Sequence, residues 1–293
     1  MMKQIHFLML FFLIPLSGFS QELTVVYTAK SNGKLMYCNC PGDPYGGLSE
    51  RVTLMKDLRK KENDFLLVDA GDAVGLFGDY DLKASCVYRM MNMMRYDAAA
   101  AGRNEVYRGI SRIQTAAKVA DFPIISAAFA DSASGEPIFT PYVTKKVGGA
   151  TVAVTALCDT SIFMHIIRQA FDFTILTPQE ALGTIMKPMS RDSDFVVVLS
   201  QMAPETNEAL LDMFPAIDLI VEAHNNKPYD PPVVKPNGVI VCPGTHGEHA
   251  GLVTLRKTGK TVTLVRSELI PVKDIPEDPY AHKIVVEYYR ERK

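Results

Sequence analysis

The stretch Phe65-Leu66-Leu67-Val68-Asp69-Ala70-Gly71-Asp72 decides the fold of this chain. A short apolar run ends in Asp69 and Asp72, which is the pattern of a buried central strand with acidic side chains at its carboxyl end. Open α/β sheets bind their ligands at that edge. The two carboxylates are either metal ligands or an acidic turn after a core strand, and this stretch alone fits both interpretations.

Helices and strands alternate on both sides of this strand. A helix is predicted at residues 47–61, with its polar residues mostly off the apolar face: Glu50, Arg51, Lys56 and Asp57. Further helices are predicted at 82–95, 111–120, 179–189, 205–214 and from about 279, and strands at 22–27, 97–101, 123–129, 142–147, 151–157, 194–201, 218–224, 238–242, 252–256 and 261–265. This order predicts an α/β fold in which two packed mixed β-sheets are flanked by helices.

Residues 1–20 have the layout of a secretory signal peptide. Lys3 precedes an almost unbroken apolar run at residues 7–16, and small residues follow it. An uncleaved membrane anchor is the alternative interpretation. We expect residues 21–293 to form a single domain that is exported to the periplasm or the cell exterior. Because no second long apolar run exists, we expect no stable membrane span after cleavage.

Charge and cysteine content exclude some functions and leave others open. The formal net charge is −2, and no basic stripe is present, so a nucleic-acid polymer is excluded as a partner. The five cysteines are an odd number, and Cys38 and Cys40 form a Cys-Asn-Cys triplet in a Gly- and Pro-rich loop. Cys86, Cys158 and Cys242 are predicted to be buried inert thiols. The methionines of residues 90–94 are predicted to fill the core rather than to bind copper.

Several segments, in this order, resemble the calcineurin-like metallophosphoesterases, particularly the catalytic domain of secreted 5′-nucleotidases and UDP-sugar hydrolases. The segments are residues 25–35, 46–48, 68–72, 102–105 with 198–201, and 220–226. The resemblance implies a four-layer metallophosphoesterase-like fold and a site in which Asp, His and Asn side chains hold two divalent metals and a bridging water. The separate nucleotide-binding domain of the nucleotidases is expected to be absent.

Of the first two motifs of that family, only the second is preserved. Where the family has Asp-x-His before a glycine, this chain has Lys30-Ser31-Asn32, so that an ammonium replaces a carboxylate and an amide replaces an imidazole. A lysine ammonium has no acceptor with which to bind a metal. The second motif is intact, and the resemblance implies that Asp72 occupies the place of the metal-bridging aspartate.

The later motifs depart further from the family. Gly-Asn-His-Glu is replaced by Gly102-Arg103-Asn104-Glu105, although a shift of one residue would let Asn104 act as a ligand. The fourth motif ends in Gln201 instead of His, and the fifth retains only His224, with Asn226 in the second His position.

Two cations thus replace family ligands, and we predict that the site holds no metal. We expect Lys30 to pair with Asp72, and Arg103 to pair with Glu105 or with a bound phosphate. Should a divalent ion bind (Mn, Zn, Mg or Ca), its candidate ligands are Asp72, Asn104, Gln201, His224 and His246.

Three functions follow from these residues. The first is an exported pseudoenzyme that binds a small phosphate-like anion or a partner protein through Lys30, Asn32, Arg103, Glu105, Gln201 and Asn226. The second is a phosphomonoesterase with a rebuilt metal site, for which Asp72, Asn104 and His224 are the catalytic candidates. The third is a redox accessory protein that works through Cys38 and Cys40, because a subgroup of the family resembles this chain in its Cys-x-Cys loop. A disulfide that staples the loop, or spectator thiols, are the alternatives.

Overall fold

Two six-stranded sheets form the centre of the computed structural model, which describes residues 20–38, 41–62, 64–107, 109–159 and 173–292. The first sheet has the order β14 (Thr261–Pro271), β13 (His249–Thr258), β1 (Ser20–Thr28), β2 (Leu66–Asp69), β3 (Ala98–Ala100) and β4 (Ile124–Ile125). The second has the order β11 (Val233–Lys235), β12 (Gly238–Val241), β10 (Leu219–Glu222), β9 (Phe195–Ser200), β7 (Ala150–Leu157) and β6 (Tyr142–Val147).

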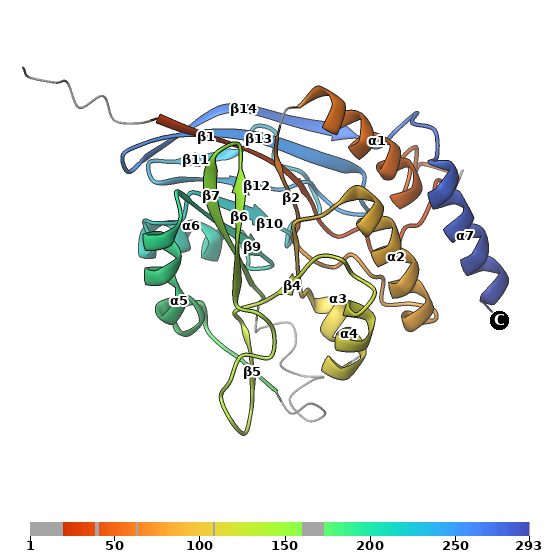
Figure 1. Cartoon of the computed structure of the whole chain (residues 1–293), viewed down its shortest axis with the longest axis horizontal. Helices are drawn as coiled ribbons and strands as arrows, with labels where there is room; N and C mark the ends of the chain where they lie inside the picture. Colours follow the sequence, from red (N-terminus) through yellow and green to blue (C-terminus); the bar gives the residue numbers. More distant parts are fainter. Residues whose placement is uncertain (1–19, 39–40, 63, 108, 160–172, 293) are drawn as a thin grey trace, which may run out of the picture.

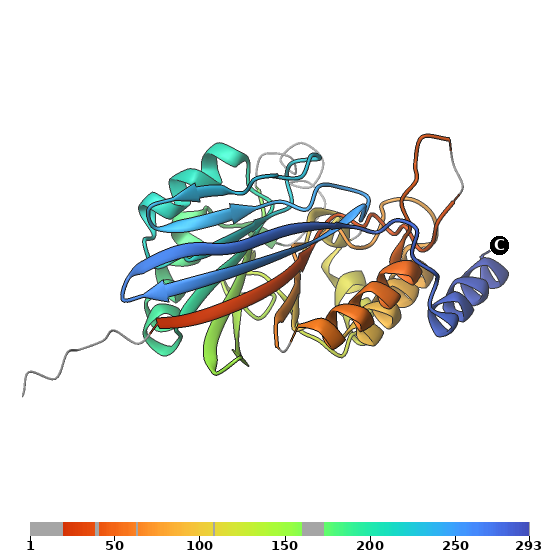
Figure 2. The same ribbon diagram turned by 90° about the horizontal axis from the view of Figure 1, so that it is seen from above.

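Helices cover the outer faces of both sheets. Figure 1 shows α1 (Leu48–Lys61), α2 (Tyr80–Met94) and α7 (Pro279–Glu291) on one side of the molecule, and α5 (Pro178–Asp192) and α6 (Pro204–Met213) on the other. Figure 2 shows the long β13–β14 hairpin running alongside β1. The predicted fold of two packed mixed sheets flanked by helices is confirmed.

Three apolar clusters hold these layers together. Alternate residues of β1, such as Val25 and Tyr27, face the second sheet and pack against residues such as Val154 and Val197. Val26 faces the opposite way and packs under α1, α2 and α7. A third cluster joins the second sheet to α5 and α6. This alternation follows from the period of two along a strand.

Parallel pairing brings the functional segments to one edge. In the first sheet β1, β2, β3 and β4 are parallel, and in the second β7, β9, β10 and β12 are parallel. The carboxyl ends of these strands therefore lie at the same edge of each sheet.

The structure corrects several predicted elements. The expected strand at 123–129 is divided into β4 and β5 (Phe129–Asp131), and β5 pairs with β8 (Phe173–Ile175) in a separate small sheet. Residues 103–106 form a short helix, α3 (Arg103–Val106), followed by α4 (Ile110–Ala117). Both β8 and β11 are too short to give a periodic signal, so the sequence did not reveal them.

Two polar residues of α1 are more deeply buried than predicted. Glu50 and Arg51, predicted to lie mostly off the buried face, are 3% and 1% exposed. Glu50 accepts a hydrogen bond from the Gly47 N–H at the start of the helix, so its burial completes the helix N-terminus. Arg51 reaches the loops around the candidate site described below.

None of the helices in the described ranges has the length and apolar character needed to cross a membrane. The predicted signal peptide lies almost wholly outside the described residues, and it remains a prediction.

We predict that Gly251→Ala destabilises the fold. A Cβ at Gly251 would lie 1.9 Å from Cζ of Tyr27, the residue opposite it on β1, and that ring is fully buried. The free energy of unfolding, measured by urea denaturation, should fall by about 1–3 kcal/mol because the packed interior has no room for the displaced ring.

Gly183→Ala is the matched control. Gly183 lies inside α5 with open space around its Cβ position, so alanine there should raise the stability by about 0.5–1 kcal/mol. Equal effects of the two substitutions would contradict the packing described here.

Candidate functional site

The candidate residues come from loops that follow the parallel strands, and the structure brings most of them together. Lys30 and Asn32 follow β1, Asp72 follows β2, Arg103, Asn104 and Glu105 lie in α3 after β3, Gln201 follows β9, and His224 and Asn226 follow β10. Hydrogen bonds link most of these residues across both sheets, but His224 contributes only its main-chain oxygen, and its Nδ1 is buried without a hydrogen-bond partner in the described part of the chain.

Lys30 joins the first sheet to the second. Its side-chain ammonium donates hydrogen bonds to the main-chain oxygen of His224 (3.1 Å) and to Oδ1 of Asn226 (2.5 Å). The expected pairing of Lys30 with Asp72 is therefore wrong. Burial, and next the nearby guanidinium of Arg103, lower the pKa of Lys30, whereas Asp72 acts in the opposite direction.

A buried carboxylate fixes the loop that receives Lys30. Oε1 of Glu222 accepts hydrogen bonds from the Asn225 N–H (3.2 Å) and the Tyr229 hydroxyl (3.0 Å), and Oε2 accepts one from Nδ2 of Asn207 (3.0 Å). Glu222 is completely buried. Sequence reasoning missed its role, although a glutamate that ends an apolar strand is a signal that could have indicated it.

Asp72 faces an arginine. Its Oδ2 lies 3.3 Å from a guanidinium nitrogen of Arg103, and its Oδ1 accepts a hydrogen bond from the Asn104 main-chain N–H at 2.9 Å. The side chains of Asp72 and Arg103 are 3% and 19% exposed. Asp72 also has a φ of 57°, a left-handed conformation that is uncommon for residues other than glycine and asparagine.

Glu105 does not pair with Arg103, contrary to one expectation. Its carboxylate accepts hydrogen bonds from the main-chain N–H groups of Asp72 and Val74, both at 3.0 Å. Burial and the neighbouring charge of Asp72 raise the pKa of Glu105. Glu105 therefore shapes the turn that carries Asp72 and has no part in charge pairing with Arg103.

Gln201 is fully buried and its orientation is set by its neighbours. Oε1 accepts a hydrogen bond from the Arg103 main-chain N–H at 2.9 Å and a weaker one from Sγ of Cys158 at 3.5 Å. The side-chain nitrogen, Nε2, lies next to Gly71 and Gly102 and has no hydrogen-bond partner in the described part of the chain. A Cβ at Gly102 would lie 2.4 Å from the main-chain nitrogen of Asp72, and Gly71 has a φ of 96°, so both positions require glycine.

Asn32 and Asn104 extend the polar cluster. Nδ2 of Asn104 donates to Oδ1 of Asn32 at 3.0 Å, and Nδ2 of Asn32 donates to the Thr245 hydroxyl at 3.4 Å. His246 lies in the same turn as Thr245, but no hydrogen bond connects its imidazole to the candidate ligands in the described structure. His249, the first residue of β13, lies against the ring of Tyr45 with a centroid distance of 5.3 Å.

Arg51 contacts two loops of the candidate site, and the sequence did not predict this role. One guanidinium nitrogen donates to the Ser31 hydroxyl at 2.8 Å, and the other donates to the main-chain oxygen of Gly247 at 3.2 Å. Its charge also acts on the buried carboxylate of Asp69. The arginine thus ties α1 to the loop after β1 and to the turn before β13.

The cysteines divide into two groups. Cys86, Cys158 and Cys242 are free and buried, as predicted, and burial raises the pKa of each thiol, to about 11 for Cys86 and about 12 for Cys242. Cys38 is disulfide-bonded. Cys40 lies outside the described residues.

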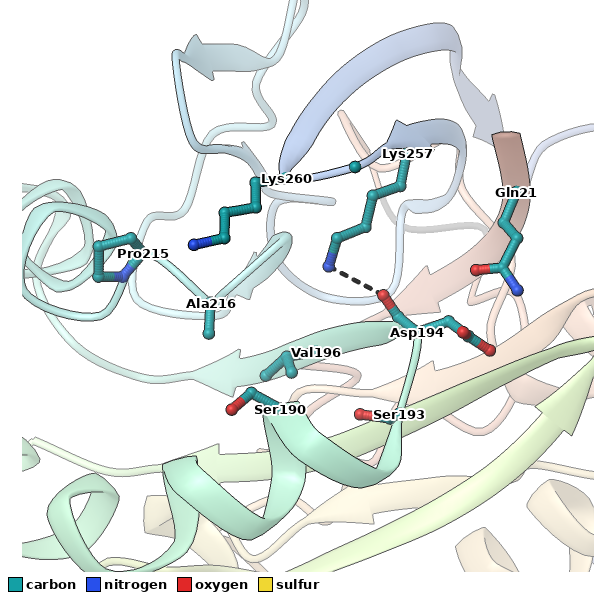
Figure 3. A pocket seen from close by; sticks show the side chains of 10 residues that line it. Gln21, Ser190, Ser193, Asp194, Val196, Pro215, Ala216, Lys257 and Lys260 are labelled. Atoms are coloured by element: carbon teal, nitrogen blue, oxygen red, sulfur yellow. Dashed lines mark hydrogen bonds between the residues drawn. The ribbon is translucent and has the colours of Figure 1, made fainter. Parts of the chain in front are cut away.

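Two cavities lie away from the cluster. One of about 570 Å³ is at the opposite end of the strands, where Figure 3 shows Lys257 pointing toward Asp194. The other, of about 400 Å³, lies beside the Cys38 loop and is lined by Tyr37, Glu50 and neighbouring residues. Among the residues that the structure describes, no group of three or more His, Cys, Asp and Glu side chains could hold a metal ion.

The chain is similar in sequence to 5′-nucleotidases and in fold to a calcineurin-like phosphoesterase, although it matches no family model. It is 34% identical over 149 residues to snake venom 5′-nucleotidase from Crotalus adamanteus, a match that covers 46% of this chain and 25% of the relative. It is 26% identical over 233 residues to human 5′-nucleotidase, covering 72% and 39%. The calcineurin-like phosphoesterase YfkN of Bacillus subtilis has a similar structure, with a TM-score of 0.76 and 17% identity over 93% of this chain and 98% of that one.

We predict an energetic coupling between Asp72 and Arg103. A double-mutant cycle with Asp72→Asn and Arg103→Met, measured by urea denaturation, should give a coupling of about 1–3 kcal/mol, because removing either partner leaves the other charge or its hydrogen-bonding groups unpaired in a mostly buried place.

The control cycle uses Asp192→Asn and Arg191→Met, an ion pair whose side chains are 55% and 70% exposed. Its coupling should lie within experimental error, because solvent screens such pairs. A result in which both cycles give the same small coupling is incompatible with an ion pair at Asp72.

Proposed function

Because the chain is a homologue of 5′-nucleotidases and calcineurin-like phosphoesterases and has the metallophosphoesterase fold, we propose that it is a non-hydrolytic member that binds a small phosphate-like anion, either free or on a partner protein. In this proposal Lys30 and Arg103 replace the two divalent metals. The aligned part of the chain spans about a quarter of the length of the venom nucleotidase, so the activity of the relatives is not carried over to it.

The main support for the proposal is that the side-chain oxygens of this cluster already accept hydrogen bonds from nitrogen donors. Asp72 and Gln201 accept hydrogen bonds from Arg103, Asn226 accepts one from Lys30, and Asn32 accepts one from Asn104. A metal needs such oxygens as ligands, and here N–H donors already occupy them. The residues present therefore do not fit a pair of divalent ions.

Unused donors support an anion as the ligand. Nε of Arg103 is buried without a hydrogen-bond partner in the described chain, and only one of the guanidinium nitrogens contacts Asp72. A divalent ion about 4 Å from Lys30 or Arg103 would meet a repulsion of several kcal/mol even at an effective dielectric of about 20.

We also propose that the protein is exported. The support is the signal-peptide pattern of residues 1–20, together with the similarity to a nucleotidase found in snake venom.

We predict that untagged protein, purified without chelators, contains far less than one divalent metal ion per chain by elemental analysis. In the same buffer, isothermal titration with inorganic phosphate should detect binding, and Arg103→Met should weaken it at least about tenfold because a charge-assisted, two-point contact is lost. Arg191→Met, at an exposed arginine of α5, should leave phosphate binding unchanged.

Three results would overturn the proposal. Stoichiometric metal in the purified protein, or Mn²⁺-dependent hydrolysis of an aryl phosphate that Asp72→Asn abolishes, would establish the alternative of a phosphomonoesterase with a rebuilt site. Reversible thiol titration that Cys38→Ser removes, without phosphate binding, would instead support the redox accessory role.

A further inference from the structure

The outer edge of β14 is a surface that the proposed anion site does not use. β14 has 11 residues and ends the first sheet, with β13 on one side. In the described part of the chain no strand pairs with its other side, and Figure 1 shows β14 at the outer margin of the molecule. Such an edge presents unpaired N–H and C=O groups that can pair with another strand.

This edge has some of the features by which edge strands avoid pairing, namely the charged residues Arg266 and Glu268 and a bulge, but other such features are missing. Residues 261–271 contain no lysine, and the only proline is Pro271 at the end of the strand. The ladder with β13 is irregular between Thr254 and Leu255, which leaves Val265 as an extra residue with 45% of its surface exposed. The edge is therefore long, partly apolar and accessible.

Charges on the strand match each other under two-fold symmetry. Arg266 and Glu268 are separated by one residue, so both point to the same face of the sheet. If two copies of β14 pair antiparallel about an axis through Ser267, Arg266 of each copy lies opposite Glu268 of the other. In the same register Val265 lies opposite Leu269, which is half-buried within one chain. Opposite charges and apolar side chains at directly facing positions stabilise paired strands.

We propose that the protein forms a two-fold symmetric dimer by antiparallel pairing of β14 with β14 of a second copy. Within one chain Arg266 already contacts Glu268 at 2.7 Å and Glu62 at 2.9 Å. These contacts hold the Arg266 guanidinium on the face of the sheet where Glu268 of the second copy lies in the dimer. A two-fold contact uses the same surface on both partners, so it closes as a dimer and does not extend into a fibre.

Sedimentation velocity over a range of protein concentrations tests the dimer. The unmodified protein should be dimeric at about 100 µM. Arg266→Glu or Glu268→Arg alone should raise the dissociation constant at least about tenfold, because each places like charges opposite one another twice. The double variant Arg266→Glu with Glu268→Arg should return to within about threefold of the original value.

Arg256→Glu is the matched control, because Arg256 on β13 and Glu22 on β1 form a comparably exposed ion pair that β14 separates from the free edge of the sheet. This variant should leave the dissociation constant unchanged. A monomer at about 100 µM, or single reversals without effect, would overturn the proposal.

Amide hydrogen exchange of the unmodified protein tests the same surface without any substitution. Exchange at residues 265–269 should slow as the protein concentration rises, whereas the exposed β13–β14 turn around Gly259 should show no change. Concentration-dependent protection elsewhere and none at residues 265–269 would place the contact on another surface and refute pairing through β14.

Discussion

The contact between Lys30 and the loop after β10 determines how the functional edge of this molecule is assembled. Lys30 follows a strand of the first sheet, and His224 and Asn226 follow a strand of the second. A buried ammonium must find acceptors for its protons, since an unpaired charge in the interior is costly. The loop that supplies these acceptors is held in turn by Glu222, so a chain of satisfied polar groups joins the two sheets where they would carry a ligand.

Arg103 makes a second connection of the same kind. Its main-chain N–H is bound by Gln201 of the second sheet, and its guanidinium is bound by Asp72 of the first. Lys30 and Arg103 thus act as fixed positive charges with short contacts on both sides. The chain shares its arrangement of strands with solved phosphoesterase structures, and in this chain Lys30 and Arg103 lie at the edge where the parallel strands end. The same fold can support different site chemistry because the site depends on a few loop residues.

Buried charges are unusually important around this edge. Arg51, Asp69, Glu105 and Glu222 are all almost inaccessible to solvent, and each contacts a loop or turn that carries a candidate residue. Breaking one member of such a network leaves its partner unsatisfied, so these residues fix the loops in one conformation. The β14 edge differs in kind, because its charges are exposed and become paired across a surface rather than within the interior.

The sequence by itself determined the fold class, the order of most elements and the segments that resemble the calcineurin-like phosphoesterases. It could do so because apolar periodicity and the placement of residues 65–72 depend on local pattern. It did not determine the partners of the residues in those segments. Lys30 was expected to pair with Asp72, and Arg103 with Glu105 or a bound phosphate. Instead Arg103 binds Asp72, and Lys30 reaches across to residues about 195 positions later in the chain. The roles of Arg51 and Glu222 were missed for the same reason. Which of several nearby charges pair is decided by loop geometry and by the hydrogen bonds that buried groups must make, and both exist only once the two sheets have packed together.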